Sequence, residues 1–262
     1  AVHDLPPGLL AGVRFILAGL ILGAAALLRG QPWPRAAKDW RAASVMGVLL
    51  VVIGNGFVTW AEQWVPSNEA ALIIASSALW MAWFGTFGPK GTPLSGWTKI
   101  GLAVGFAGVG LLMLPGATDE SGLLIPMLAI LGSSMAWCGG TIYGRNAGID
   151  VPPLMFAACQ MLIGGGILTV WGIAAGELGR VEWTNAGLIG LTYLTLVGSC
   201  LAYGTYMWLI RHTTPARLAT VAYVNPVVAT VLGWWVLDET LAGLQLVGMA
   251  VILVGVVMVG RK

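Results

Sequence analysis

The chain has 262 residues, of which 58% are hydrophobic and 9% are charged. A soluble domain carries about a quarter charged residues, so this composition excludes a soluble globular fold. The net charge is +2, and no basic run indicates binding to nucleic acid. The composition therefore predicts a protein embedded in a lipid bilayer.

Apolar runs of helix length predict nine membrane spans. A span needs about 20 mostly apolar residues, and none of these runs alternates in the way a membrane β-barrel strand does. Polar, turn-forming segments separate the runs, for example Pro66-Ser67-Asn68. In chain order, the expected spans are residues 8–28, 42–63, 68–88, 98–115, 122–144, 152–175, 186–210, 215–236 and 242–260.

Positive charges alternate between successive loops. One alternate set of loops, with the C-terminus, holds Arg29, Arg35, Lys38, Arg41, Lys90, Lys99, Arg145, Arg211, Arg217, Arg261 and Lys262. The other set holds Arg180, and the remaining Arg14 lies inside a span. Positively charged loops stay in the cytoplasm. We therefore expect a cytoplasmic C-terminus and residue 1 on the outer side.

The two halves of the chain resemble each other at a nearly constant offset in residue number. Order is kept throughout: the corresponding positions are Leu5-Pro6-Pro7 and Val151-Pro152-Pro153, Trp40 and Trp183, Gly54 and Gly198, Gly101 and Gly248, and Gly108 and Gly255. We therefore predict two domains, a first repeat at residues 1–117 and a second repeat at residues 118–262.

The second repeat holds five spans, and the first holds four. The counterpart of span 122–144 would precede Leu5, so a helix of about 20–25 residues is expected to be absent from this chain. Because five is odd, the second copy enters the membrane from the opposite side. The predicted fold is an all-α polytopic membrane protein, an inverted repeat of five plus five helices without its first helix. This plan is typical of secondary transporters.

Candidate substrate-binding residues are the polar and aromatic side chains expected within the spans. In a transporter they would line a partly apolar cavity, whereas in ordinary helix packing Ser and Thr hydroxyls bond backbone carbonyls. The candidates are Asn55, Trp60, Ser77, Trp80, Trp137, Tyr203, Tyr206, Tyr223 and Asn225.

Arg14 is the one formal charge well inside a predicted span, ~9 Å from its outer end at about 1.5 Å per residue. Three roles compete: an ion pair with Glu62, capture of a substrate carboxylate, or snorkelling to the surface. We favour the ion pair, with the substrate role second. No Asp or Glu falls at mid-membrane depth in the sequence, which favours uniport over proton coupling.

Pro226 lies within span 215–236 and cannot donate to the helix ladder, so the Ala222 carbonyl loses its partner. The proline is either a hinge or a static kink tolerated by its neighbours. As a hinge, Pro226→Ala is expected to slow transport more than it disturbs folding. Unchanged flux in reconstituted vesicles would contradict the hinge.

Other chemistry has little support in the sequence. Cys138, Cys159 and Cys200 sit in apolar runs without a CxxC pair and are interpreted as small core residues. An intramembrane enzyme would need a HExxH pair, paired aspartates or a Ser with a buried His; His3 is terminal and His212 adjoins a loop. We expect no enzymatic activity, no cofactor and no metal site.

Several motifs, in order, resemble the drug/metabolite transporter superfamily in its EamA branch, over nearly the whole chain. They are Leu5-Pro6-Pro7 leading into Arg14-Phe15, Gly101 to Gly110, Val224-Asn225-Pro226-Val227, Leu237-Asp238-Glu239-Thr240-Leu241 and Gly248. The first copy departs from the family, with Gly88-Pro89-Lys90-Gly91-Thr92 in place of a Gly-Glu turn and Ala78-Leu79 in place of Asn-Pro.

This resemblance implies export of amino acids or related metabolites across the bacterial inner membrane. The 13 Trp residues make the aromatic amino acid exporter type attractive. The expected partners are a small-molecule substrate and the lipid bilayer, and the expected state is a monomer. A carrier of sugars or of phosphorylated or nucleotide-linked metabolites is the alternative, but it would need several basic residues facing the cavity.

Overall fold

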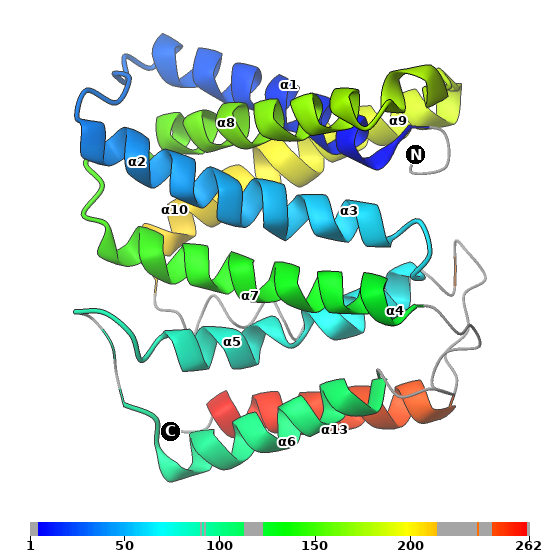
Figure 1. Ribbon diagram of the computed structural model, residues 1–262. Coiled ribbons are helices and arrows are strands. Elements are labelled where there is room, and N and C mark those ends of the chain that lie inside the picture. The colour runs from blue at the N-terminus through cyan, green and yellow to red at the C-terminus, as the bar shows by residue number, and fades with distance from the viewer. Residues whose placement is uncertain are drawn as a thin grey trace. The chain divides into compact units, whose positions relative to one another are not determined.

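The computed structural model describes residues 5–89, 91, 93–112, 123–213, 235 and 243–260. All regular elements in these residues are helices (Figure 1). The long helices are α1 (Pro7–Leu28), α6 (Gly96–Leu112), α7 (Leu124–Asn146), α8 (Pro153–Ala174) and α13 (Gly243–Gly260). The prediction of an all-α polytopic fold is confirmed.

Two further spans are continuous helices with a π-helical middle. The first consists of α2 (Ala37–Met46), η1 (Gly47–Gly56) and α3 (Phe57–Ala61). The second consists of α9 (Asn185–Tyr193), η3 (Leu194–Tyr203) and α10 (Gly204–His212), and it follows the short 3₁₀ helix η2 (Glu177–Arg180). π-helices are rare and often mark functional sites.

The predicted spans coincide with helices wherever the structure describes them. Five helical runs are long and apolar enough to cross a bilayer: residues 7–28, 37–61, 124–146, 153–174 and 185–212. Shorter apolar helices cover 69–84, 96–111 and 246–259. Predicted span 68–88 differs in being broken at Ala75–Ser76 into α4 (Ser67–Ile74) and α5 (Ser77–Phe84). Span 215–236 lies outside the described residues, except for Trp235.

The chain divides into two compact units, each with helices from both predicted repeats. Unit 1 comprises residues 1–63 and 143–213, and unit 2 comprises residues 64–142 and 214–262. Helix α7 crosses the division after Ile142. The predicted boundary between repeats, at residues 117 and 118, lies outside the described residues.

Helices α1 and α8, which correspond in the two repeats, have the same length and begin and end at equivalent positions. Helices α1 and α8 both have 22 residues and begin at the second proline of a Pro-Pro pair. Proline suits this position because its missing N–H would have no partner in the first helical turn. Shortly after both helices, Gly30 and Gly176 adopt φ values of 69° and 74°, a conformation that favours glycine.

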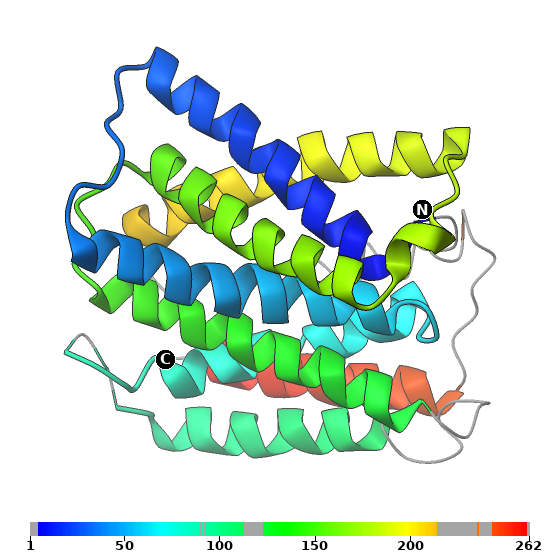
Figure 2. The same ribbon diagram turned by 45° about the horizontal axis from the view of Figure 1, so that its top comes forward.

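In unit 1, α1 and α8 pack against each other in antiparallel directions (Figure 2). Residue numbers fall along one helix as they rise along the other. The contact of Gly19 with Leu162 and the contact of Gly165 with Ile16 are equivalent, because Gly19 corresponds to Gly165 and Ile16 to Leu162 in the repeat. Small residues permit this approach. The contacts are Gly12 with Thr169, Gly23 with Ala158, Gly19 with Leu162, and Gly165 with Ile16.

In unit 2, α6 and α13 repeat this arrangement. The Gly255 carbonyl lies against Gly101, and the Gly248 carbonyl lies against Gly108. Gly101 corresponds to Gly248 and Gly108 to Gly255 in the repeat, so exchanging the two copies interchanges the two contacts. This pair is therefore also antiparallel and pseudo-symmetric. Equivalent helices that pack antiparallel are what an inverted repeat requires.

The α6–α13 contact yields a stability prediction. A Cβ atom at Gly255 would meet the backbone of Gly105 and the Gly101 carbonyl, neither of which can rotate away. Gly255→Ala is therefore expected to destabilise the protein by about 1–3 kcal/mol, as overpacking does. Thermal unfolding in detergent measures this.

The matched control is Gly110→Ala, because a Cβ there would meet nothing within 4 Å. Both changes alter helix propensity alike. Equal melting temperatures for the two variants would contradict close backbone packing at Gly255.

An exposed ion pair joins α2 to the segment before α8 within unit 1. Lys38 Nζ lies 2.5 Å from Asp150 Oδ2. The hydrogen bond from Lys38 lowers the pKa of the Asp150 carboxyl. Solvent-exposed pairs of this kind contribute little to stability.

Candidate functional site

The membrane-embedded cation of unit 1 is held by contacts from α1 and η3. Arg14 Nε donates a hydrogen bond to Ser199 Oγ at 2.7 Å. Its Cζ lies 4.7 Å from the centroid of the Phe15 ring, a distance typical of a cation–π contact. A Cβ at Gly198 would lie 3.2 Å from Arg14 Nη2, so glycine there leaves room for the guanidinium.

Ser199, the hydrogen-bond partner of Arg14, lies in a π-helical segment. Both η1 and η3 are π-helices of 10 residues, and they occupy corresponding places in the two repeats. In η1, Asn55 Nδ2 donates to the Leu50 carbonyl at 2.8 Å. Both copies thus place a polar side chain in a π-helical segment.

A buried amide lies at the position equivalent to Arg14 in the second repeat. Gln160 on α8 is fully buried, and its Oε1 accepts a hydrogen bond from Tyr203 Oη at 2.9 Å. Its Nε2 contacts Met207 Sδ at 3.2 Å. The Tyr203 ring stands edge-on to Phe15 at 6.3 Å. Gln160 was missed in the sequence, although its correspondence to Arg14 in the repeat could have indicated it.

The other candidates in unit 1 lie less deeply. Trp60 and Tyr206 are half-buried, and Glu62 is exposed. Glu62 acts electrostatically on the Arg14 guanidinium. The ion pair between Arg14 and Glu62 stays a prediction.

Unit 2 contains a cluster of four aromatic rings centred on Trp80. The aromatic cluster consists of Trp80, Trp83 and Phe84 of α5 and Phe106 of α6. The Trp80 ring centroid lies 4.6 Å from that of Phe106, 5.7 Å from that of Trp83 and 5.9 Å from that of Phe84. Of these rings, Trp80 is buried and Trp83 is exposed.

Helix α7 contacts α5 through Cys138 and also carries the candidate Trp137. Cys138 is fully buried and donates its thiol to the Ser77 carbonyl at 3.2 Å. Trp137 is half-buried, and its carbonyl accepts a hydrogen bond from Thr141 at 2.8 Å. Ser77 and Trp80 lie one turn apart on α5, while Tyr223, Asn225 and Pro226 lie outside the described residues.

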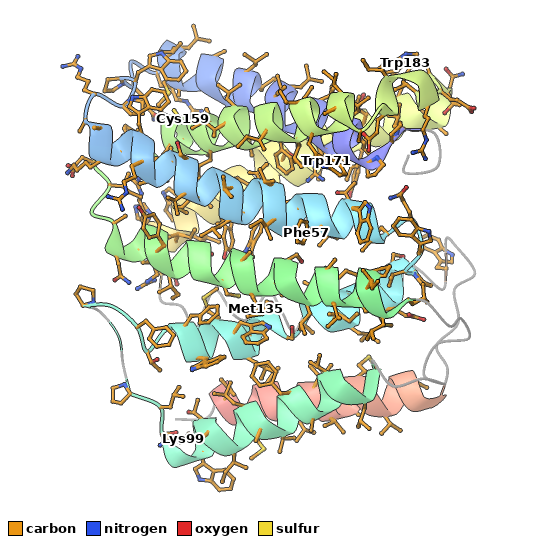
Figure 3. The ribbon with its side chains drawn as sticks, in the orientation of Figure 1. Phe57, Lys99, Met135, Cys159, Trp171 and Trp183 are labelled. Carbon is orange, nitrogen blue, oxygen red and sulfur yellow. The ribbon has the colours of Figure 1, made fainter. Side chains whose placement is uncertain are left out.

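A buried carboxylate that the sequence did not indicate caps the start of α1. Glu177 of η2 accepts hydrogen bonds from the backbone N–H groups of Leu9, at 2.9 Å, and Gly8, at 3.3 Å. Trp171, labelled in Figure 3, lies against Gly8. A carboxylate at a helix N-terminus satisfies unpaired N–H groups and the helix dipole.

The described residues contain no group of three His, Cys, Asp or Glu side chains that could hold a metal ion. Within unit 1, the structure groups the Arg14 cation with the Ser199 hydroxyl and the Phe15 ring. Groups of these types can bind and orient a small molecule.

Comparison with known proteins places the chain among transporters. The chain is 38% identical over 260 residues to the inner membrane transporter YedA of Escherichia coli strain K12, covering 98% of this chain and 83% of YedA. It is 29% identical over 258 residues to protein PecM of Dickeya dadantii, covering 97% and 82%. It is 25% identical over 257 residues to the transporter YvbV of Bacillus subtilis, covering 98% and 83%.

A solved crystal structure shares the fold, with a TM-score of 0.70 and 21% identity over 98% of this chain and 89% of that one. The EamA-like transporter family matches the chain over residues 1–114 and 124–261. The resemblance seen in the sequence is thereby confirmed: this polytopic helical chain belongs to the EamA-like transporter family.

Proposed function

We propose that the chain exports neutral amino acids, aromatic ones included, and related small metabolites across the bacterial inner membrane. Export proceeds by alternating access, as uniport, and the chain acts as a monomer without enzymatic activity. Its C-terminus lies in the cytoplasm and residue 1 on the outer side. Family membership and the inner-membrane location of YedA support this proposal.

The proposal rests on Arg14, whose guanidinium uses only part of its hydrogen-bonding capacity within the described residues. Its Nε is hydrogen-bonded to Ser199, whereas its Nη groups hydrogen-bond to no described residue. A charge within a membrane span is costly and is retained where it pairs or binds. The planar guanidinium fork matches a carboxylate with two parallel hydrogen bonds. All amino acids share such a carboxylate.

Glu62 has a second role in this proposal. Its charge acts on Arg14 and balances the cation before substrate arrives. When a carboxylate binds, it takes over part of that interaction, and Glu62 is left to attract the substrate ammonium. The ion pair and the substrate role of Arg14 are then two stages of one cycle.

The remaining candidates would contact substrate within their own units. In unit 1 we assign such roles to Asn55, Trp60, Tyr203 and Tyr206, and in unit 2 to Ser77, Trp80 and Trp137. Tyr223 and Asn225 would also bind substrate, and Pro226 would serve as the hinge. Aromatic side chains with few polar groups suit substrates with an apolar part.

Flux measurements with the chain in reconstituted vesicles test the proposal. The panel contains tyrosine, phenylalanine, tyramine, a neutral sugar and a sugar phosphate. We expect saturable flux of the two amino acids, and weak flux of tyramine because it lacks the carboxylate. Flux of the sugar or sugar phosphate without amino acid flux would favour the alternative class. Proton movement that accompanies the amino acid would overturn uniport.

A further inference from the structure

Hydroxyl groups in the described helices usually bond to their own backbone. Thr59, Ser133, Thr141 and Thr169 each donate to a carbonyl three or four residues earlier. Ser76 departs from this pattern, because its side chain is fully buried and its Oγ has no hydrogen-bond partner among the described residues. Leaving a buried hydroxyl without a partner is energetically unfavourable.

Trp80 carries a second unpaired polar atom in unit 2. Its indole Nε1 is buried without a hydrogen-bond partner in the part of the chain that the structure describes, and the side chain is 8% exposed. Trp80 follows Ser76 by four residues, a spacing that puts both side chains on one helix face. Unsatisfied buried polar groups are few in native proteins, so two neighbouring ones call for an explanation.

The backbone is irregular at the same place. The Ala75 N–H bonds to the Ala71 carbonyl, four residues earlier, but the Ser76 N–H bonds to Ile73, three residues earlier. The Ser76 carbonyl then accepts from both Leu79 and Trp80, at 2.9 and 3.1 Å. Ala75 and Ser76 keep helical dihedral angles, with ψ values of −24° and −17°, so the helix tightens to a 3₁₀ turn without unwinding. A 3₁₀ turn within a helix often marks a functional hinge or a sequence under strain.

Aromatic rings surround the Trp80 side chain. The Phe106 ring meets the Trp80 ring at an interplanar angle of 60°, and the Trp83 ring stacks on it at 28°. Edge-to-face and offset contacts of these types favour further aromatic rings. The surroundings thus suit a flat apolar group with one polar end.

We propose that Ser76 and Trp80 form a subsite for the hydroxyl of a phenol. The indole N–H can only donate, so the ligand atom that it meets must accept. The serine hydroxyl can accept in turn. A phenolic hydroxyl does both at one oxygen: it accepts from Trp80 Nε1 and donates to Ser76 Oγ. This assignment deepens the proposed transport of aromatic amino acids and rests on it for the role in flux.

The subsite selects tyrosine over phenylalanine. A site built to hydrogen-bond a hydroxyl disfavours the analogue without it, because the site's polar groups then stay unpaired. We expect the wild-type chain to favour tyrosine flux over phenylalanine flux by at least about tenfold, the effect of about 1.4 kcal/mol.

Two variants test the assignment in vesicles. Ser76→Ala and Trp80→Phe each remove one polar atom, and both should bring the tyrosine preference close to one by lowering tyrosine flux. Ser133→Ala is the matched control, since Ser133 is also buried and its hydroxyl bonds to the Ile130 carbonyl at 2.6 Å. Trp97→Phe, at an indole that is 64% exposed, is the second control. Unchanged preference in Ser76→Ala and Trp80→Phe would overturn the subsite.

A binding measurement separates the subsite from amino acid transport. We expect p-cresol, which has no carboxylate, to raise the melting temperature of the wild-type chain in detergent more than toluene does. Ser76→Ala should remove that difference without lowering the melting temperature of the unliganded protein, because it deletes an unpaired hydroxyl. Equal stabilisation by p-cresol and toluene would refute the subsite. A cresol-specific shift without amino acid flux would refute the proposed transport alone.

Discussion

Arg14→Gln is expected to reduce flux of carboxylate-bearing substrates by about 100-fold. A hydrogen bond to a charged group contributes about 1.5–3 kcal/mol, and about 1.4 kcal/mol is a factor of ten. The loss should appear in initial rates at low substrate concentration in vesicles, with little change for tyramine. Arg14→Lys should retain part of the flux, because it keeps the charge but loses the Ser199 bond and the planar fork.

The matched control is Arg180→Gln, since Arg180 is exposed at the end of η2. Its flux should equal that of the wild type. If Arg14 served only as a structural partner of Glu62, Arg14→Gln would lower the melting temperature, and the double change with Glu62→Gln would restore it. Wild-type flux in a folded Arg14→Gln protein would contradict the carboxylate role.

Glu177→Ala is expected to destabilise the protein by about 3 kcal/mol. It leaves the buried N–H groups of Gly8 and Leu9 without an acceptor, which costs about 1–3 kcal/mol for each group. It also removes a favourable charge from the start of α1. Glu177→Gln keeps an acceptor oxygen but no charge, so about half of the loss is expected. Thermal or denaturant unfolding in detergent measures both.

Glu182→Ala provides the control for the loss of a carboxylate in the same segment. Glu182 is exposed and follows η2 by two residues. Its replacement should change stability by less than about 0.5 kcal/mol, as surface substitutions do. A melting temperature of Glu177→Ala equal to that of Glu182→Ala would show that the cap contributes nothing.

The membrane spans could be read from the sequence because the bilayer leaves the chain few options. Within lipid, each backbone polar group must be satisfied inside its own segment, so an apolar run of sufficient length becomes a helix. The Pro-Pro pairs before α1 and α8 marked the helix starts for a local reason, the proline at the first helical position.

Hydropathy did not reveal the backbone irregularities. The π-helical segments η1 and η3 and the break at Ala75–Ser76 have the apolar composition of ordinary helix. Helix type there depends on which carbonyl each N–H meets, and packing against neighbouring helices decides that choice. A serine in a membrane helix usually donates its hydroxyl to a backbone carbonyl. The sequence therefore does not show that Ser76 Oγ lacks such a partner among the described residues.

The sequence by itself determined that this chain is a multi-span helical protein, because hydropathy is a local signal. Loop charge and collinear glycines added the prediction of an inverted repeat. Only the tertiary structure decided which side chains meet. Arg14 reaches Ser199 across 185 residues, Gln160 reaches Tyr203, and Glu177 caps α1 across 169 residues. No local propensity encodes such contacts, since they arise when helices from opposite repeats pack together. Packing in unit 2 likewise leaves Ser76 Oγ and Trp80 Nε1 buried without a hydrogen-bond partner among the described residues.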